Sequence, residues 1–341
     1  MRYYALATDY DGTLASEGRV DEATLEALER LRNSGRRLIL VTGREMNDLL
    51  QVFPQIDLFE RVVAENGALL YRPATRETKR LAEPPPENFA KTLRDRRIAP
   101  LSVGEVIVAT WTPHEKTVLD VIHALGLELQ VIFNKGAVMV LPSGVNKATG
   151  LIAALEELSL SPHNTVGVGD AENDHALFGL AECAVAVANA LPPVKEHADL
   201  VTAGDHGAGV AELIDALIAD DLRAAEPELR RHDVVLGNRA DGKPVMLPPY
   251  GLNVLVAGAS GSGKSTVVAG LLERFAAAGY QYCAVDPEGD YETLPNAVVL
   301  GGAGRPPTVG DVLRLLDRPD EATVVNLLGV PLGDRPPFYA A

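Results

Sequence analysis

Asp9-Tyr10-Asp11-Gly12-Thr13 is the stretch that decides the fold of this chain. It follows an apolar run from Tyr4 to Ala7, which predicts a buried β-strand. Two carboxylates at the end of a strand can face one cavity, where one attacks a phosphorus centre and the other moves a proton. An Asp-x-Asp pair alone is also typical of an ordinary polar turn. The interpretation therefore depends on the stretches that follow.

The composition indicates a globular protein of about two domains, since the chain has 341 residues, of which 47% are hydrophobic and 23% charged. A net charge of -16 disfavours broad electrostatic binding to nucleic acid or to anionic membranes, although a local basic patch would still allow it. Cys183 and Cys283 form no metal-ligand pattern and indicate a reducing compartment. Because the sequence shows no apolar leader and no run of transmembrane length, we expect a cytoplasmic protein with no membrane partner.

The next stretches continue the pattern of a parallel sheet. Leucines at helical spacing predict a helix over 21–32, and an apolar strand over 37–41 ends in Thr42-Gly43-Arg44. Strand, helix, strand order predicts parallel strands with right-handed crossovers and ligands at their carboxyl ends. The Thr42 hydroxyl and the Gly43 N–H could hold phosphate oxygens there. Thr-Gly-Arg alone also fits a strand-end turn without a ligand.

The segment from about residue 73 to 141 interrupts this pattern. Pro84-Pro85-Pro86 interrupts the regular secondary structure, and a hairpin is predicted around Asn134-Lys135-Gly136. The spacing predicts a small α+β insert of roughly 70 residues that leaves and rejoins the parallel sheet. Such an insert could cover the strand-end pocket as a lid that excludes water and selects substrates.

Two later stretches place charged residues at the same strand ends. Lys147 opens a predicted helix, where a lysine opposes the helix dipole, so it has either a compensating role or an ordinary place on the surface. A predicted strand over 165–168 ends in the acidic turn Gly169-Asp170-Ala171-Glu172-Asn173-Asp174. Asp170 and Asp174 would repel Asp9 unless a cation were shared among them. Hard oxygen ligands of this kind suit Mg²⁺.

Taken together, residues 1–219 resemble the haloacid dehalogenase (HAD) phosphatase superfamily, in its Cof-type branch with a type IIB lid. The resemblance rests on four motifs in family order, which are Asp9-Tyr10-Asp11-Gly12-Thr13, Thr42-Gly43-Arg44, Lys147, and Gly169-Asp170 through Asn173-Asp174. It implies an α/β fold with a Rossmann-like parallel sheet, an aspartyl-phosphate, Mg²⁺ as cofactor and a small phosphorylated substrate. The lid looks shorter than is usual for this branch, so specificity for sugar phosphates does not carry over with the resemblance.

The resemblance also implies a role for each matched residue. Asp9 would be the nucleophile, and Asp11 would protonate the leaving group and then activate water. The residues implied to contact the phosphoryl group are Thr42, Gly43, Lys147 and Asn173. The residues implied to hold Mg²⁺ are Asp9, Asp11 through its backbone carbonyl, Asp170 and Asp174. Together they would supply the positioning and charge neutralisation on which phosphoryl transfer depends.

A second motif follows residues 220–233, whose charged composition predicts a solvated linker. An apolar strand is predicted over 252–257, and it leads into a glycine-rich loop and a helix over 267–277. Glycines let backbone N–H groups surround a phosphate at a helix N-terminus, with Lys264 on the β- and γ-phosphates and Ser265 on Mg²⁺. The alternative is a glycine-rich turn with no ligand. The residues predicted to contact a nucleotide are Gly258, Gly261, Gly263, Lys264, Ser265 and Thr266.

Residues 234–341 resemble the opening third of the HerA-FtsK class of P-loop ATPases. The resemblance rests on three features. They are a predicted hairpin over 234–247, the glycine-rich loop over 258–265, which has the Gly-x4-Gly-Lys-Ser pattern of a Walker A motif, and the stretch Asp286-Pro287-Glu288-Gly289-Asp290-Tyr291. It implies a partial P-loop α/β domain that binds ATP and forms a homo-oligomer. The sequence shows no later Walker B acid, sensor or arginine finger, so we expect an incomplete domain from a longer protein, in which ATP hydrolysis is not implied.

These observations lead to one main hypothesis and two alternatives. The main one is a Mg²⁺-dependent phosphatase for a small organic phosphate, phosphosugars included, fused to an ATP-binding module. The first alternative is an enzyme that processes nucleic-acid ends with kinase or motor activity. The acidic balance and the lack of interleaved basic and aromatic residues disfavour it. The second alternative is a module whose assembly ATP regulates, with the phosphatase secondary.

Overall fold

The computed structural model describes residues 1–226 and 229–340 and divides the chain into two compact units, Met1–Leu229 and Arg230–Ala341. The linker predicted over 220–233 therefore spans the division between the units, and a short 3-10 helix, η5 (Arg223–Ala225), lies within it. Pro227 of that linker and Ala341 lie outside the described residues.

The described residues of unit 1 form an eight-stranded sheet in the order β12-β11-β10-β1-β2-β3-β4-β5. The strands from β12 to β3 are parallel, whereas β4 and β5 run antiparallel to their neighbours. The predicted parallel sheet is thus confirmed for unit 1. The strands are β1 (Ala5–Thr8), β2 (Arg37–Val41), β3 (Arg61–Ala64), β4 (Leu69–Arg72), β5 (Glu77–Arg80), β10 (Thr165–Gly169), β11 (Cys183–Ala186) and β12 (Leu200–Val201).

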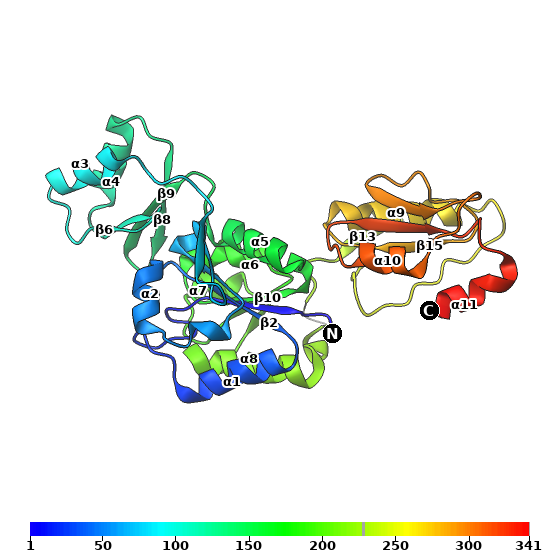
Figure 1. Ribbon diagram of the computed structural model, residues 1–341, viewed down its shortest axis with the longest axis horizontal. Helices are drawn as coiled ribbons and strands as arrows, with labels where there is room; N and C mark the ends of the chain where they lie inside the picture. Colours follow the sequence, from blue (N-terminus) through cyan, green and yellow to red (C-terminus); the bar gives the residue numbers. More distant parts are fainter. Residues whose placement is uncertain (227–228, 341) are drawn as a thin grey trace. The chain divides into compact units, whose positions relative to one another are not determined.

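Helices cover both faces of this sheet, which explains why β1 is buried at every position. Figure 1 shows α1 (Glu22–Asn33) and α8 (His206–Asp220) on one face, and α5 (Lys147–Leu158) and α6 (His175–Leu180) on the other. The helix predicted over 21–32 is confirmed as α1. Asp21 caps it by accepting a hydrogen bond of 2.7 Å from the N–H of Thr24. Two shorter helices, α2 (Met46–Val52) and α7 (Pro192–Glu196), complete the unit's main layer.

The insert forms its own small layer. Its antiparallel sheet has the order β6-β7-β9-β8, and its helices are α3 (Glu87–Asp95) and α4 (Glu115–Ala124). Phe89, Val118 and Val140 belong to a core separate from that of the main sheet. The hairpin predicted around 134–136 is confirmed, because Asn134 pairs with Ala137. The strands are β6 (Ser102–Val103), β7 (Val108–Trp111), β8 (Leu129–Asn134) and β9 (Ala137–Pro142).

The insert starts later than the sequence indicated. We predicted its start at about residue 73, but β5 lies in the main sheet, where Lys79 pairs with Leu70 of β4. The exposed residues of β5 gave no apolar pattern that could assign it to either layer. The elements that belong to the insert alone run from α3 to β9.

A buried carboxylate attaches the insert to the main layer. Glu65 begins the 3-10 helix η2 (Glu65–Gly67) directly after β3, and its side chain accepts backbone N–H bonds from Glu105 (2.8 Å), Val106 (2.7 Å) and Ile107 (2.8 Å). Gly104 permits this approach, since a Cβ there would lie 2.4 Å from Oε1 of Glu65. The turn before β7 is therefore fixed over the carboxyl end of β3.

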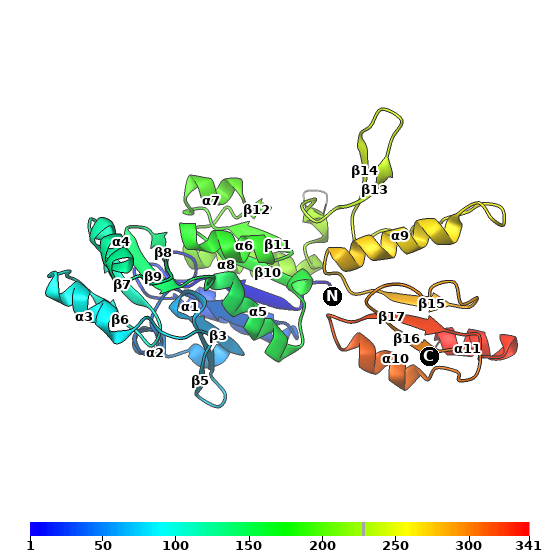
Figure 2. The same cartoon turned by 90° about the horizontal axis from the view of Figure 1, so that it is seen from above.

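Unit 2 contains a hairpin and a small parallel sheet among its described residues. Figure 2 shows β13 (Val234–Asn238) and β14 (Pro244–Leu247) standing apart from the sheet of order β15-β17-β16. The strands of that sheet are β15 (Cys283–Asp286), β16 (Ala297–Gly301) and β17 (Ala322–Asn326). The helices are α9 (Lys264–Ala277), α10 (Val309–Leu316) and α11 (Arg335–Ala340).

The prediction of a strand before the glycine-rich loop was wrong. Residues 252–257 are all described, yet they form no strand, and Leu255 is 89% exposed. An apolar segment becomes a parallel strand only when neighbouring strands supply its hydrogen bonds and cover its faces. The described sheet of unit 2 offers this segment no such pairing. In the described parts of the chain, no helix combines the length and the apolar character needed to cross a membrane.

Candidate active site

The carboxyl ends of β1 and β10 bring the predicted acidic residues together around a lysine. Asp9 follows β1, and its N–H donates to the carbonyl of Val168 on β10 at 3.0 Å, which carries the ladder one step beyond the strand. Lys147, the first residue of α5, is fully buried. Its Nζ donates to Oδ1 of Asp9 and to Oδ1 of Asp174, both at 2.6 Å. These two carboxylates compensate for the unfavourable interaction of a lysine with the helix dipole at this position.

The acidic turn after β10 supplies two carboxylates with different surroundings. Oδ2 of Asp174 accepts the N–H groups of Asp170 and Ala171, each at 2.9 Å, while its Oδ1 binds Lys147. Asp170 accepts a bond of 3.0 Å from the Thr13 hydroxyl through Oδ1, and its Oδ2 binds the ammonium group of Lys135 from the insert. Asp174 thus closes the turn with Oδ2 and binds Lys147 with Oδ1, whereas Asp170 faces the insert.

The charges of this cluster do not balance. Burial raises the pKa of Asp9 well above its usual range, Lys147 opposes that shift, and Asp174 and Asp170 add to it. Burial raises the pKa of Asp170 as well, with Lys135 acting against the shift. Burial alone would lower the pKa of Lys147, but Asp174 and Asp9 together raise it above its ordinary value. The site therefore holds an ionised lysine among carboxylates that need further positive charge.

This donor set fits Mg²⁺. Asp9, Asp170 and Asp174 each offer an oxygen, and these atoms lie within 4.8 Å of one another. Hard carboxylate oxygens of this kind are typical Mg²⁺ ligands. A cation already occupies Oδ2 of Asp170, namely the Lys135 ammonium. Nearby, Oδ1 of the buried Asn173 has no hydrogen-bond partner in the described structure.

Asp11 lies at the open side of the cluster, with its side chain 43% exposed. Its carboxylate is held by Arg44, with Nε at 2.6 Å from Oδ2 and Nη2 at 2.7 Å from Oδ1. Arg44 also binds Asp48 and stacks 5.4 Å from the ring centroid of Tyr10. We did not predict Arg44 as a site residue, although its place in the Thr-Gly-Arg stretch was the available signal.

The predicted phosphate-binding residues lie beside this cluster. Thr42 is buried, and its hydroxyl accepts the N–H of Arg44 at 3.1 Å. A Cβ on Gly43 would lie 3.6 Å from Nδ2 of Asn173, so these two residues are neighbours. Nδ2 of Asn173 donates to Oδ1 of Asn66 in η2 at 3.0 Å. The ends of β2, β3 and β10 therefore converge on one place.

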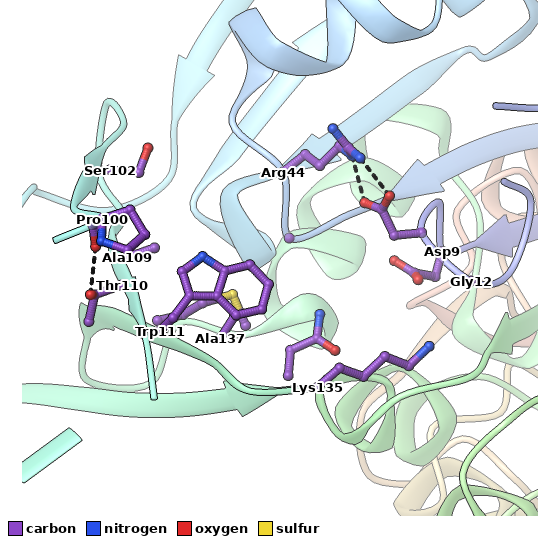
Figure 3. Close-up of a pocket in the computed structure, with 14 residues that line it drawn as sticks. Asp9, Gly12, Arg44, Pro100, Ser102, Ala109, Thr110, Trp111, Lys135 and Ala137 are labelled. Atoms are coloured by element: carbon purple, nitrogen blue, oxygen red, sulfur yellow. Dashed lines mark hydrogen bonds and ion pairs between the residues drawn. The ribbon is translucent and has the colours of Figure 1, made fainter. Parts of the chain in front are cut away.

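A cavity of about 490 Å³ separates these strand ends from the insert. Figure 3 shows Asp9, Gly12 and Arg44 on one side and Pro100, Thr110 and Trp111 of the insert on the other, with Lys135 extending toward Gly12. Sequence reasoning missed Trp111 and Lys135 as cavity residues. The available signal for Lys135 was its position in the predicted turn of the lid.

The glycine-rich loop of unit 2 leads into α9, which begins at Lys264. Gly261 and Gly263 have φ angles of 75° and 89°, so the loop uses backbone conformations that glycine favours. Nζ of Lys264 donates to the carbonyl of Ala259 at 3.0 Å, and the Ser265 hydroxyl donates to Oδ2 of Asp290 at 2.8 Å. Gly258 and Thr266 flank this stretch, and both are exposed.

Comparisons with known proteins concern unit 1. The sequence profile of haloacid dehalogenase-like hydrolases matches residues 6–96 and 123–214. Phosphoglycolate phosphatase 2 of Saccharolobus solfataricus is 30% identical over 224 residues, which are 64% of this chain and 93% of that protein. Phosphoglycolate phosphatase of Methanothermobacter thermautotrophicus is 31% identical over 221 residues, 62% of this chain and 96% of that protein. A solved HAD subclass IIB sugar phosphatase matches with a TM-score of 0.52 at 21% identity, covering 63% of this chain and 98% of its own, and this likeness shows the fold.

Proposed function

The chain belongs to the haloacid dehalogenase-like hydrolases, and we propose that unit 1 hydrolyses a small organic phosphate through an aspartyl-phosphate, with Mg²⁺ as cofactor. The observation that carries the proposal is the buried Lys147, bound to Asp9 and Asp174 at the carboxyl edge of the sheet. A fully buried lysine between carboxylates serves a charged ligand better than it serves stability, because taking such groups out of water costs on the order of several kcal/mol per ion. Since the curated relatives are named phosphoglycolate phosphatases, phosphoglycolate is the first substrate to test, and phosphosugars come second.

In the first half of the proposed reaction, a carboxylate oxygen of Asp9 forms a bond to phosphorus while the ester P–O bond breaks. Asp11 supplies the proton that the leaving oxygen takes. In the second half, water attacks the phosphorus of the aspartyl-phosphate, its proton passes to Asp11, and Asp9 is released with inorganic phosphate. Lys147 holds the nucleophile in place and offsets its charge in both halves.

Other residues of the site position the phosphoryl group. We assign Thr42, Gly43 and Asn173 to contacts with its oxygens and Lys147 to the cation there, which the neighbouring positions of Gly43 and Asn173 support. Asp9, Asp170 and the backbone carbonyl of Asp11 would hold Mg²⁺, which when bound neutralises charge on phosphoryl oxygens. We assign Asp174 to orienting Lys147 and the acidic turn, because its Oδ2 accepts two backbone N–H groups of that turn and its Oδ1 binds the buried Lys147, whereas the partners of Asp170 are the ends of two side chains.

The test is Mg²⁺-dependent phosphate release from p-nitrophenyl phosphate by the full chain. Native protein should release phosphate, and Asp9→Asn should not, because an amide is a poor nucleophile toward phosphorus. Asp95→Asn is the matched control, since Asp95 is exposed at the end of α3 in the insert. Equal activity in native protein and Asp9→Asn, with folding checked by circular dichroism, would contradict the proposal.

We also propose that the glycine-rich loop of unit 2 binds ATP. The supporting observation is the loop that ends in Lys264 and Ser265 at the start of α9, with Asp290 at hydrogen-bond distance from the Ser265 hydroxyl. Backbone N–H groups at such a helix start attract phosphate. Calorimetry with Mg-ATP should show binding to the full native chain, weakened about tenfold or more in Lys264→Ala by loss of a charged hydrogen bond. Lys243→Ala, at an exposed position of unit 2, should bind as the native chain does.

The two alternative functions give different results in the same preparations. A nucleic-acid end-processing enzyme would release phosphate from phosphorylated DNA ends in preference to phosphoglycolate or a phosphosugar. A module whose assembly ATP regulates would change its homo-oligomeric size on ATP addition, as measured by light scattering, while its phosphatase activity stays constant. Preference for the small esters, with no change of size, supports the main proposal.

A further inference from the structure

The insert places one of its own cations inside the cavity. Lys135 lies in the turn between β8 and β9 with a φ of 46°, and its backbone N–H donates to Oε2 of Glu172 at 3.2 Å. Its Nζ binds Oδ2 of Asp170. Gly12 makes room for this side chain, because a Cβ there would lie 2.7 Å from Nζ. The hairpin of the insert is thus bound to the acidic turn after β10, next to Gly12 of the loop that carries the proposed nucleophile.

Two of the residues that line the cavity are cationic, namely Arg44 and Lys135. Only one of them is bound to a carboxylate that is proposed to bind the metal. Arg44 is bound to both oxygens of Asp11 and also to Asp48. Lys135 is bound to Asp170, which is among the proposed Mg²⁺ ligands. Two cations on one carboxylate repel each other. Metal binding at Asp170 would therefore displace the Lys135 ammonium and leave Arg44 with its partners.

A displaced Lys135 ammonium would be free to bind another anion. Its side chain lines the cavity and is 41% exposed, so a ligand in the cavity can reach it. The flexible four-carbon stem of a lysine lets the ammonium turn toward a new partner within the same cavity. Trp111 and Met139, which line the insert side of the cavity, offer mainly apolar surface. Asp9 and Asp11, the carboxylates that line the cavity, already bind Lys147 and Arg44, so a substrate would bring the further anion.

We propose that Lys135 binds a carboxylate on the leaving group, and that it thereby selects small phosphate esters of hydroxy acids over esters of neutral alcohols and sugars. The inference rests on the proposed phosphatase function and specifies its substrate class. It assigns Lys135 a role in specificity, while bond making and breaking stay with Asp9 and Asp11. The ion pair with Asp170 is then the resting position of the same ammonium.

The first experiment compares kcat/KM for phosphoglycolate and for 2-hydroxyethyl phosphate, in which a neutral hydroxymethyl group replaces the carboxylate. Lys135→Met should lower the ratio of the two kcat/KM values about tenfold or more, the size expected when one hydrogen bond to a charged group is removed. Lys135→Arg keeps the charge and should retain most of the ratio. Lys116→Met is the matched control, since Lys116 is exposed on α4 of the same insert, and its ratio should equal the native one.

The second experiment measures Mg²⁺ affinity by calorimetry without substrate. Lys135→Met should bind Mg²⁺ several-fold more tightly than native protein, because no ammonium then competes for Asp170. An unchanged kcat/KM ratio in a folded Lys135→Met, or unchanged Mg²⁺ affinity, would overturn the inference. Failure of the native chain to hydrolyse either ester or p-nitrophenyl phosphate would instead refute the proposed function, and the Mg²⁺ titration would still test the competition.

Discussion

Replacing Glu65 by alanine should loosen the insert from the main sheet of unit 1. The carboxylate is 1% exposed and accepts the N–H groups of Glu105, Val106 and Ile107. Residue 65 has a φ of 50°. Alanine and glutamate both carry a Cβ, so each meets the same backbone strain there. The substitution therefore removes the hydrogen bonds of the carboxylate without changing the conformational preference.

The size of the effect follows from the three backbone hydrogen bonds that alanine cannot accept. A hydrogen bond to a charged group contributes about 1.5 to 3 kcal/mol, and a buried N–H left without a partner costs a similar amount. Burial of the charged Glu65 carboxylate offsets part of the stabilisation from these hydrogen bonds. Burial raises the pKa of Glu65 above its ordinary value, while the three backbone N–H groups lower it. We therefore expect the free energy needed to separate the insert from the sheet to fall by about 3 to 5 kcal/mol, which is less than the sum of three separate hydrogen bonds.

Amide hydrogen exchange measures this effect at the place where it occurs. The N–H groups of residues 105–107 should exchange at least about a hundredfold faster in Glu65→Ala, since about 1.4 kcal/mol corresponds to each factor of ten. Glu83→Ala is the matched control, because Glu83 is exposed in the segment that leads into the insert. If exchange at 105–107 and the free energy of unfolding in urea both equal those of the control, the carboxylate does not hold the insert.

Two further predictions concern unit 1. Arg72 holds the pKa of Glu157 down at about 2, below its ordinary 4.5, so the stabilisation is present above pH 4.5 and is lost as the pH falls toward 2. The difference in unfolding free energy between native protein and Glu157→Gln should shrink over that range in urea titrations, and a constant difference would contradict the assignment. Gly67 has a φ of 108°, and a Cβ there would lie 1.9 Å from the carbonyl oxygen of Asn146. Gly67→Ala should destabilise unit 1 by about 3 kcal/mol or more, and thermal unfolding should show a smaller loss for Gly126→Ala, whose Cβ would meet open space at a φ of 63°.

Local patterns in the sequence were enough to find the elements that carry the site. The spacing of leucines and the N-cap at Asp21 predicted α1, and the turn residues around Lys135 predicted the β8–β9 hairpin. The strand-end rule for parallel sheets placed Asp9 and Asp170 at one edge before any contact was known. These features depend on residues close in sequence, so periodicity and turn chemistry suffice to predict them.

Pairings between distant segments were decided by the tertiary structure. Arg44 with Asp11, Glu65 with the turn before β7, and Lys135 with Asp170 join residues 33 or more positions apart, and no local pattern specifies such pairs. The same limit explains the error at 252–257, where an apolar run had the composition of a strand but lacked neighbouring strands to pair with. In unit 1, the sequence by itself determined which of the site residues stand at the ends of strands and in turns. Only the packing of the insert and the helices against the sheet decided which charges meet, because a buried charge takes its partner from whatever the fold brings within hydrogen-bond distance.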